Sequence, residues 1–187
     1  ASRGLGDVYK RQVQPLYHRP GELVGDDIER SLQLAARVLN ANIGVRVVST
    51  IHGDFDHHAS ELSAHADVLG ALDRGLRSFF RGLSPAVAQR TTVMTFSEFG
   101  RKVHVNDSRG TDHGRAGHML VLGPRVRGGM YGRHPSFSNL GDYDDPAPTL
   151  DFRSVYAGIL QGWLRANPRT VLGATYAPLR LFRSAPG

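Results

Sequence analysis

The sequence contains no cysteine, which excludes disulfide bonds, thiolate metal ligands and cysteine nucleophiles. Long hydrophobic runs are missing too, and none approaches the roughly 20 residues that span a bilayer. We therefore expect neither a membrane span nor a signal segment in this chain. A P-loop and a Gly-x-Ser-x-Gly elbow are also absent. Any metal must be held by Asp, Glu and His, and nine histidines are available.

Lysine is almost absent as well: among 23 basic residues, only Lys10 and Lys102 are lysines. Such an excess of arginine is typical of codon bias in a GC-rich genome, and the arginines are scattered along the chain. A nucleic-acid interface instead concentrates positive charge on one face, with interleaved aromatic residues. Despite the net charge of +6, we expect no nucleic-acid partner. Binding through the arginines remains the alternative, and it would depend steeply on salt.

The chain has 187 residues, 40% of them hydrophobic and 21% charged, which suits one globular domain with a buried core. Residues 1–12 lack periodicity and are similar to a translated sequencing-adapter end. We interpret them as a non-native, adapter-derived segment. On this interpretation residues 13–187 are native and the protein continues upstream. An ordinary flexible N-terminus is the alternative.

Hydrophobic patterning predicts alternating helices and strands. Apolar residues recur at helical spacing over residues 28–39, 62–83 and 155–164, with Ser60 as the expected N-cap of the second helix. Runs typical of strands cover residues 45–51, 91–96 and 119–122. This order predicts an α/β fold, with a mainly parallel sheet and helices on both faces. Ligands of such sheets gather beyond the carboxyl ends of the strands.

A polar cluster with the sequence HGDFDHH follows the first predicted strand. It contains His52, Asp54, Asp56, His57 and His58. Asp56 and His58 are two residues apart, so both side chains can point the same way in an extended loop. Carboxylate oxygen and imidazole nitrogen are the mixed ligands that zinc and similar ions use. Alternatively, the acids cap the following helix and the histidines are solvated.

Two further groups could contribute ligands. Glu98 follows the second predicted strand, and Asp112 with His113 lies between two glycines that let the backbone bend freely. The alternatives are that Glu98 pairs with Arg101 or Lys102, that Asp112 is a turn residue, and that His113 is incidental.

Six motifs occur in a fixed order along the chain. They are FDHHAS from Phe55, FSEFGR from Phe96, GTDHG from Gly110, VRGGMYG from Val126, TLDFRSVYAGIL from Thr149 and VLG from Val171. Together they resemble the C-terminal half of a large bacterial family of uncharacterised proteins with an alkaline-phosphatase/sulfatase-like fold, over most of residues 24–182. The resemblance implies that residues 13–187 are the C-terminal part of one alkaline-phosphatase-like α/β domain. It also implies an exported or periplasmic location.

The superfamily hydrolyses phosphate or sulfate esters with one or two bound metals. The resemblance therefore implies a metal-dependent hydrolase of a small anionic ester, with a nucleophile upstream of this chain. We expect a divalent metal, with zinc as a candidate, held by the following residues: Asp56, His58, Glu98, Asp112 and His113. Active relatives commonly place an Asp-His pair where this chain has Glu98-Phe99, and Phe99 cannot bind a metal. The alternative is a catalytically silent exported binding or scaffold protein of the same fold.

Overall fold

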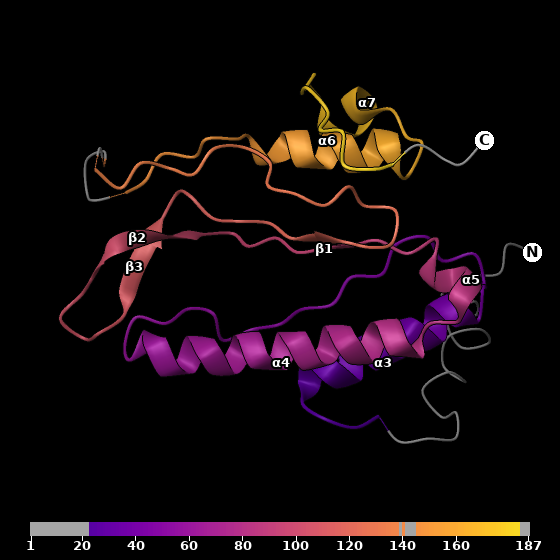
Figure 1. Ribbon diagram of the computed structural model, residues 1–187, viewed down its shortest axis with the longest axis horizontal. Coiled ribbons are helices and arrows are strands. Elements are labelled where there is room, and N and C mark those ends of the chain that lie inside the picture. The colour runs from indigo at the N-terminus through magenta and orange to yellow at the C-terminus, as the bar shows by residue number, and fades with distance from the viewer. Residues whose placement is uncertain (1–22, 139, 141–144, 184–187) are drawn as a thin grey trace, which may run out of the picture. The chain divides into compact units, whose positions relative to one another are not determined.

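The computed structural model describes residues 23–138, 140 and 145–183 (Figure 1). The adapter-derived segment predicted at residues 1–12 lies outside this range. By its internal contacts the chain divides into two compact units, residues 1–88 and 89–187. In the described part, no helix is both long and apolar enough to cross a membrane.

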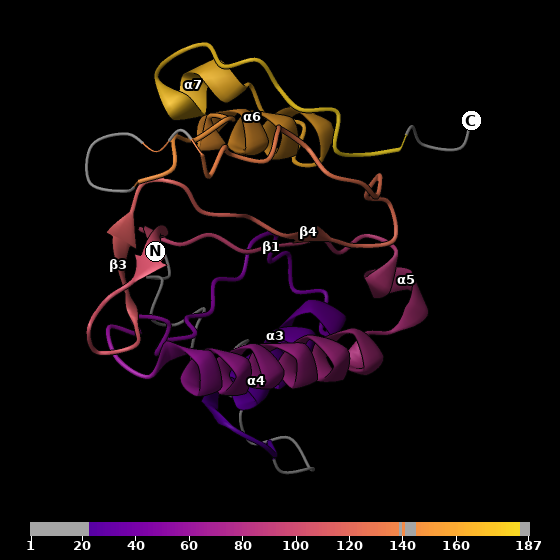
Figure 2. The ribbon, with the colours of Figure 1, turned by 60° about the vertical axis from the view of Figure 1, so that its left-hand side comes forward.

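The first unit is helical. It contains α3 (Asp27–Asn40), α4 (Glu61–Gly82) and the short α5 (Pro85–Ala88). Helices α3 and α4 lie side by side, as Figures 1 and 2 both show. The helices predicted at 28–39 and 62–83 are thus confirmed to within about a turn. The buried apolar side chains of this unit are Ile28, Leu32, Ala35, Ala36, Phe79, Leu83 and Val87.

Helices α3 and α4 can approach closely because α4 has glycines, which lack a side chain, where the two helices meet. A Cβ atom at Gly75 would lie 3.0 Å from Leu32 Cδ1 and 3.6 Å from Glu29 Cα. Seven residues further along α4, a Cβ at Gly82 would lie 3.4 Å from the Ala36 Cβ. Apolar burial along this contact stabilises the unit by about 25 cal/mol for each Å² removed from water.

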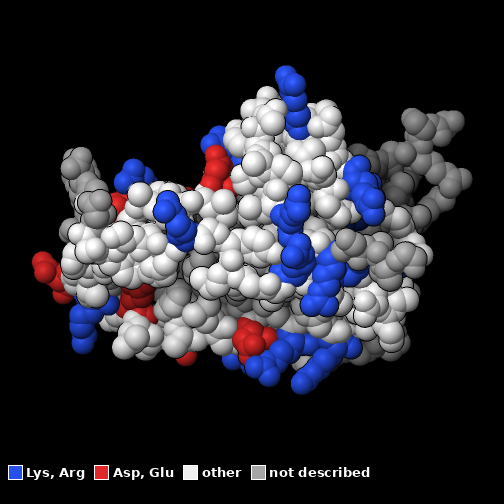
Figure 3. Space-filling model, turned by 45° about the horizontal axis from the view of Figure 1, so that its top comes forward, with Lys and Arg blue, Asp and Glu red and all other residues white. Residues whose placement is uncertain are grey.

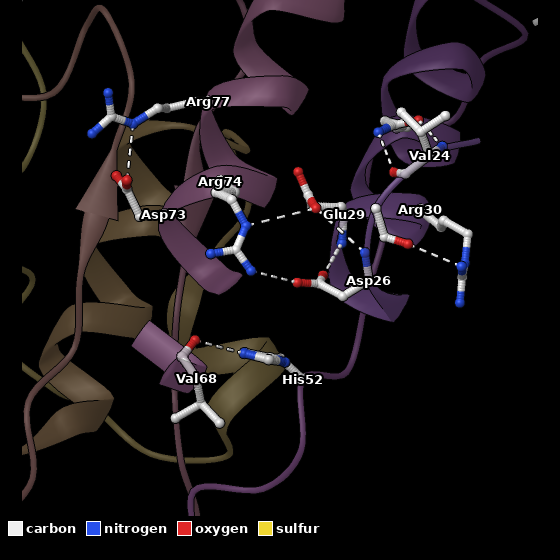
Figure 4. Close-up of polar contacts among 11 residues, drawn as sticks. Val24, Asp26, Glu29, Arg30, His52, Val68, Asp73, Arg74 and Arg77 are labelled. Atoms are coloured by element: carbon white, nitrogen blue, oxygen red, sulfur yellow. Dashed lines mark hydrogen bonds and ion pairs between the residues drawn. The ribbon is translucent and has the colours of Figure 1, made fainter. Parts of the chain in front are cut away.

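The N-terminus of α3 is capped and tied to α4 by charged side chains (Figure 4). Asp26 accepts a hydrogen bond of 3.0 Å from the Glu29 backbone N–H, and Glu29 Oε2 accepts one of 3.3 Å from the Asp26 backbone. Arg74 of α4 donates to Asp26 Oδ2 at 3.0 Å. The backbone hydrogen bond, aided by Arg74, lowers the pKa of Asp26 although partial burial opposes it. This reciprocal cap satisfies two backbone donors that the helix end would leave unpaired.

Residues 45–51 do not form the first predicted strand. Their side chains are exposed, with Val47 at 70% and Ile51 at 89%. The β-branched residues there favour extended backbone, but that preference yields a strand only where a neighbouring strand supplies ladder hydrogen bonds. The N-cap position predicted at Ser60 is confirmed, because α4 begins directly after it, but the Ser60 side chain makes no capping hydrogen bond and its φ is 46°.

The second unit contains two small antiparallel sheets in place of the predicted parallel one. Strand β1 (Val93–Met94) pairs with β4 (Val121–Leu122), and β2 (Gly100–Val105) pairs with β3 (Thr111–Gly114). The prediction of a mainly parallel, alkaline-phosphatase-like sheet with helices on both faces is therefore wrong for the described residues. Parallel neighbours need a crossover, usually a helix, between them. Between β1 and β4 the chain forms the β2–β3 hairpin and no crossover helix, so β4 runs antiparallel to β1.

Helices α6 (Phe152–Gly162) and α7 (Pro168–Leu172) complete the second unit, and α6 confirms the third predicted helix. The Asp151 side chain caps α6 by accepting from the Arg153 backbone. Asn167 caps α7 in the same way, with proline at the start of the helix. Figure 2 shows α7 beside α6.

The C-terminal segment packs closely on α6 because the helix presents a glycine to it. A Cβ atom at Gly158 would lie 2.5 Å from the Leu179 carbonyl oxygen, and the Leu179 N–H donates to the Ser154 carbonyl at 3.2 Å. Val155 and Leu181 are buried in this unit. This contact fixes the course of the chain after α7.

Candidate metal-binding clusters

The first cluster lies in the loop before α4, in the first unit, and aromatic rings attach it to that helix. The Phe55 and His57 rings each lie 5.8 Å from the His65 ring of α4, measured between centroids and edge-on. His52 lies 5.1 Å from Phe55, and its Nε2 is 3.0 Å from the Val68 carbonyl oxygen. The side chains of His52, Phe55 and His57 therefore face α4.

The side chains of Asp54, Asp56 and His58 in the same loop are exposed. The Asp56 Oδ1 atom lies 2.9 Å from His58 Nε2, as extended backbone allows for residues two apart. Two ligands of a tetrahedral zinc ion, each about 2.1 Å from the metal, lie about 3.4 Å apart. A shift of about half an ångström would therefore let this pair chelate one ion. The pair fits a divalent metal in both ligand type and spacing.

His65 belongs to this cluster, which its sequence neighbours do not indicate. Within the described part of the chain, His57 Nε2 and His65 Nδ1 are buried and have no hydrogen-bond partner. Buried ring nitrogens are normally hydrogen-bonded. From the sequence, His65 is a helix residue without polar company. Only the packing of the loop on α4 brings its ring beside that of His57.

The second cluster lies on the β2–β3 hairpin, in the second unit. Asp112 and His113 are consecutive residues of β3, so their side chains leave opposite faces of the strand. The Asp112 carboxylate accepts from Asn106 Nδ2 at 3.3 Å and lies 3.9 Å from Lys102 Nζ. Glu98 is exposed, two residues before β2. The sequence predicted a turn around Asp112 and His113, but in the structure these residues belong to strand β3, which pairs with β2.

Phe99 and His113 stack face to face. Their ring centroids are 4.1 Å apart and their planes differ by 7°. The Arg101 guanidinium lies over the Phe99 ring, 4.9 Å from its centroid. Phe99, which cannot bind a metal, therefore fixes the plane of the exposed His113 imidazole. Both ring nitrogens of an imidazole lie in that plane, so the stack also limits the directions from which an ion can reach them.

Asp145 holds the end of β3 through Arg115. Its buried carboxylate accepts from the Arg115 backbone at 2.8 Å and from Arg115 Nε at 2.5 Å. These hydrogen bonds, and the positive charge of Arg115, lower the pKa of Asp145 although burial opposes the shift. A Cβ atom at Gly114 would lie 2.8 Å from Asp145 Oδ1, so glycine is needed for this approach.

We expect the Asp145→Asn substitution to lower the free energy of unfolding at pH 7 by about 1–3 kcal/mol, since it breaks a charge-assisted pair. The native pKa is lowered, so the ionised carboxylate stabilises the fold above its unfolded value of about 3.9. That stability is lost as pH falls through the native pKa. Urea unfolding at pH 7 and at pH 3 measures both effects. A variant equally destabilised at the two pH values would contradict the assignment.

The family described as "Protein of unknown function (DUF1501)" matches residues 14–154, which is most of the chain. The chain therefore belongs to this family of uncharacterised function. No curated protein and no solved structure matches it. Both clusters lie inside the matched range, whereas α7 and most of α6 lie beyond it.

Proposed function

We propose that this protein is the metal-binding part of a metal-dependent hydrolase of phosphate or sulfate esters. The observation that carries the proposal is the exposed Asp56–His58 pair, whose carboxylate oxygen and imidazole nitrogen are 2.9 Å apart. An ordinary surface ion pair contributes little to stability. The rings of Phe55 and His57 hold the backbone of this pair against α4, so the two ligands are positioned before a metal arrives.

Each of the two units carries candidate ligands of its own. Asp56 and His58 are those of the first unit. In the second, His113 is the better ligand, because Asp112 already contacts Lys102 and Asn106, and Glu98 is the remaining carboxylate. A divalent cation would neutralise charge on the attacked ester and lower the pKa of the nucleophile. The nucleophile would lie upstream, as would an export signal.

The placement in the alkaline phosphatase/sulfatase superfamily is part of this proposal. The order of the six motifs and the types of the candidate ligands support this placement. The antiparallel pairing of the described strands does not support it. The substrate class that follows is a small anionic ester.

A catalytically silent binding or scaffold protein is the second candidate. Phe99 favours it, because an apolar ring occupies a position where a ligand is expected and stacks on His113. Such a protein would retain the cation without turnover. A turnover assay on a protein that includes the proposed upstream half would distinguish the two. Chelator-sensitive hydrolysis of a generic phosphate or sulfate monoester would support the hydrolase, and zinc binding without hydrolysis would support the silent protein.

The proposal predicts that the chain binds zinc and that zinc promotes oxyanion binding. Metal-stripped chain should take up zinc in equilibrium dialysis followed by metal analysis. Inorganic phosphate should then bind at least tenfold more tightly to the zinc-loaded chain than to the stripped chain, because the cation supplies a positive charge and an open coordination position. The proposal would be abandoned if zinc did not bind, or if zinc left the affinity for phosphate unchanged.

A further inference from the structure

A surface hollow of about 630 Å³ lies between the end of α6, α7 and the segment that follows it. It is far in sequence from both metal clusters and outside the range of the family match. The polar side chains that line it are those of Gln161, Arg165, Asn167, Arg169, Thr175 and Tyr176. Neither candidate function assigns it a role. Figure 3 brings the side of α6 and α7 forward and shows blue Lys and Arg side chains there with fewer red acidic ones.

In the described part of the chain, two arginines of this hollow have no carboxylate partner. No acidic residue lines the hollow, and among the described residues no carboxylate lies within 4.0 Å of the Arg165 or Arg169 guanidinium. Arg115, in contrast, is paired with Asp145. Two unpaired guanidinium groups at one hollow attract an anion, and each can bind an oxyanion through two parallel hydrogen bonds.

The backbone holds Arg165 in a conformation that normally selects glycine. Its φ is 55°, in the left-handed region. The turn is fixed on both sides, because the Leu164 N–H donates to the Ile159 carbonyl at 3.0 Å and the Ala166 N–H to the Leu160 carbonyl at 2.9 Å. Glycine would adopt this φ without a steric cost. Arginine at this position therefore has a conformational cost that glycine would not have. The side chain of Arg165 lines the hollow and brings a positive charge to it.

The wall of the hollow also offers an ordered aromatic ring. The Arg153 guanidinium lies over the Tyr176 ring, 4.5 Å from its centroid. Asp151 in turn fixes Arg153 through a hydrogen bond of 2.6 Å from Nη2. This chain of contacts orders the Tyr176 ring before a ligand binds, and such preorganisation lowers the entropic cost of binding.

We propose that this hollow binds an organic phosphate or sulfate monoester that has a planar body. Arg165 and Arg169 pair with the oxyanion, and Tyr176 contacts the planar group. The site needs no metal, so it is independent of the proposed hydrolase centre. It would give the protein a second place for an anionic ligand.

Phenyl phosphate is the probe for this proposal, titrated calorimetrically into the full chain after metal removal on a chelating resin. Arg165→Gly and Arg169→Gln should each weaken binding about tenfold, the loss expected for one charge-assisted contact. Arg109→Gly is the matched control. Arg109 is an exposed arginine with φ of 60° in the β2–β3 turn, so the control makes the same change in charge and backbone away from the hollow. It should leave the affinity unchanged.

Two further ligands measure the contributions of the oxyanion and of the ring to binding separately. Phenol should bind far more weakly than phenyl phosphate because it lacks the oxyanion, and inorganic phosphate should bind more weakly because it lacks the ring. Equal affinities of the wild type and both hollow variants, or the same loss in Arg109→Gly, would overturn the proposal. So would equal binding of inorganic and phenyl phosphate. Because metal is removed throughout, failure here leaves the hydrolase proposal standing. An unchanged unfolding midpoint in Arg165→Gly shows that the fold is intact.

Discussion

Replacing Asp56 with alanine is expected to weaken zinc binding about 100-fold or more. Losing a partner that merely orients a ligand already costs 10- to 100-fold in metal affinity, and Asp56 would be a ligand itself. His58→Ala should have an effect of similar size, because each residue supplies one of two ligand atoms 2.9 Å apart. Competition with a chromogenic zinc chelator measures the affinities in the full chain.

Asp67→Ala is the matched control for this loss. Asp67 is an exposed carboxylate on α4, in the same unit as Asp56, and the substitution removes the same charge. It should leave zinc affinity within about twofold of the wild type. His113→Ala tests the second cluster separately, and a loss there would place His113 among the ligands. If Asp56→Ala and His58→Ala both bound zinc as tightly as Asp67→Ala, the loop before α4 would not be a metal site.

The Leu32→Ala substitution should lower the free energy of unfolding of the first unit by about 2–5 kcal/mol, the range for leucine-to-alanine changes in packed cores. Leu32 is 6% exposed and lies against α4 at Gly75. Truncating it removes apolar contact and leaves a cavity between the two helices. Urea unfolding monitored by far-ultraviolet circular dichroism measures the change, since this unit carries most of the helix.

Leu62→Ala makes the same chemical change on the surface of α4. Leu62 is 90% exposed, so we expect a change within about 0.5 kcal/mol. The difference between the two variants isolates burial from helix propensity. Equal destabilisation by both would show that the α3–α4 contact does not stabilise the first unit.

The helices of this protein were predictable because their signals are local. The apolar spacing over 28–39 anticipated α3, and that over 155–164 anticipated α6. The sheet was not predictable in this way, because a strand is defined by its partner. The run at 45–51 has the composition of a strand but pairs with no other strand in the described part of the chain. The β2–β3 hairpin, in contrast, forms from residues that look like a polar loop.

The candidate ligands follow the same division. Sequence spacing predicted that Asp56 and His58 could share a side of the chain, and it offered Asp112 and His113 as a second pair. Strand β3 instead directs these two to opposite faces, with Asp112 beside Lys102 and His113 on Phe99. No local pattern indicated His65, because its approach to His57 depends on how a loop folds back onto α4.

The sequence by itself determined three helices, the ligand chemistry open to a chain without cysteine, and membership of a family of unknown function. Periodicity, caps and residue types act over a few positions, so they can be interpreted without a fold. Tertiary structure alone decided the antiparallel pairing of the strands, the faces on which Asp112 and His113 lie, and the grouping of Arg165, Arg169 and Tyr176. Those features depend on contacts between residues far enough apart that chain closure and packing decide which contacts form.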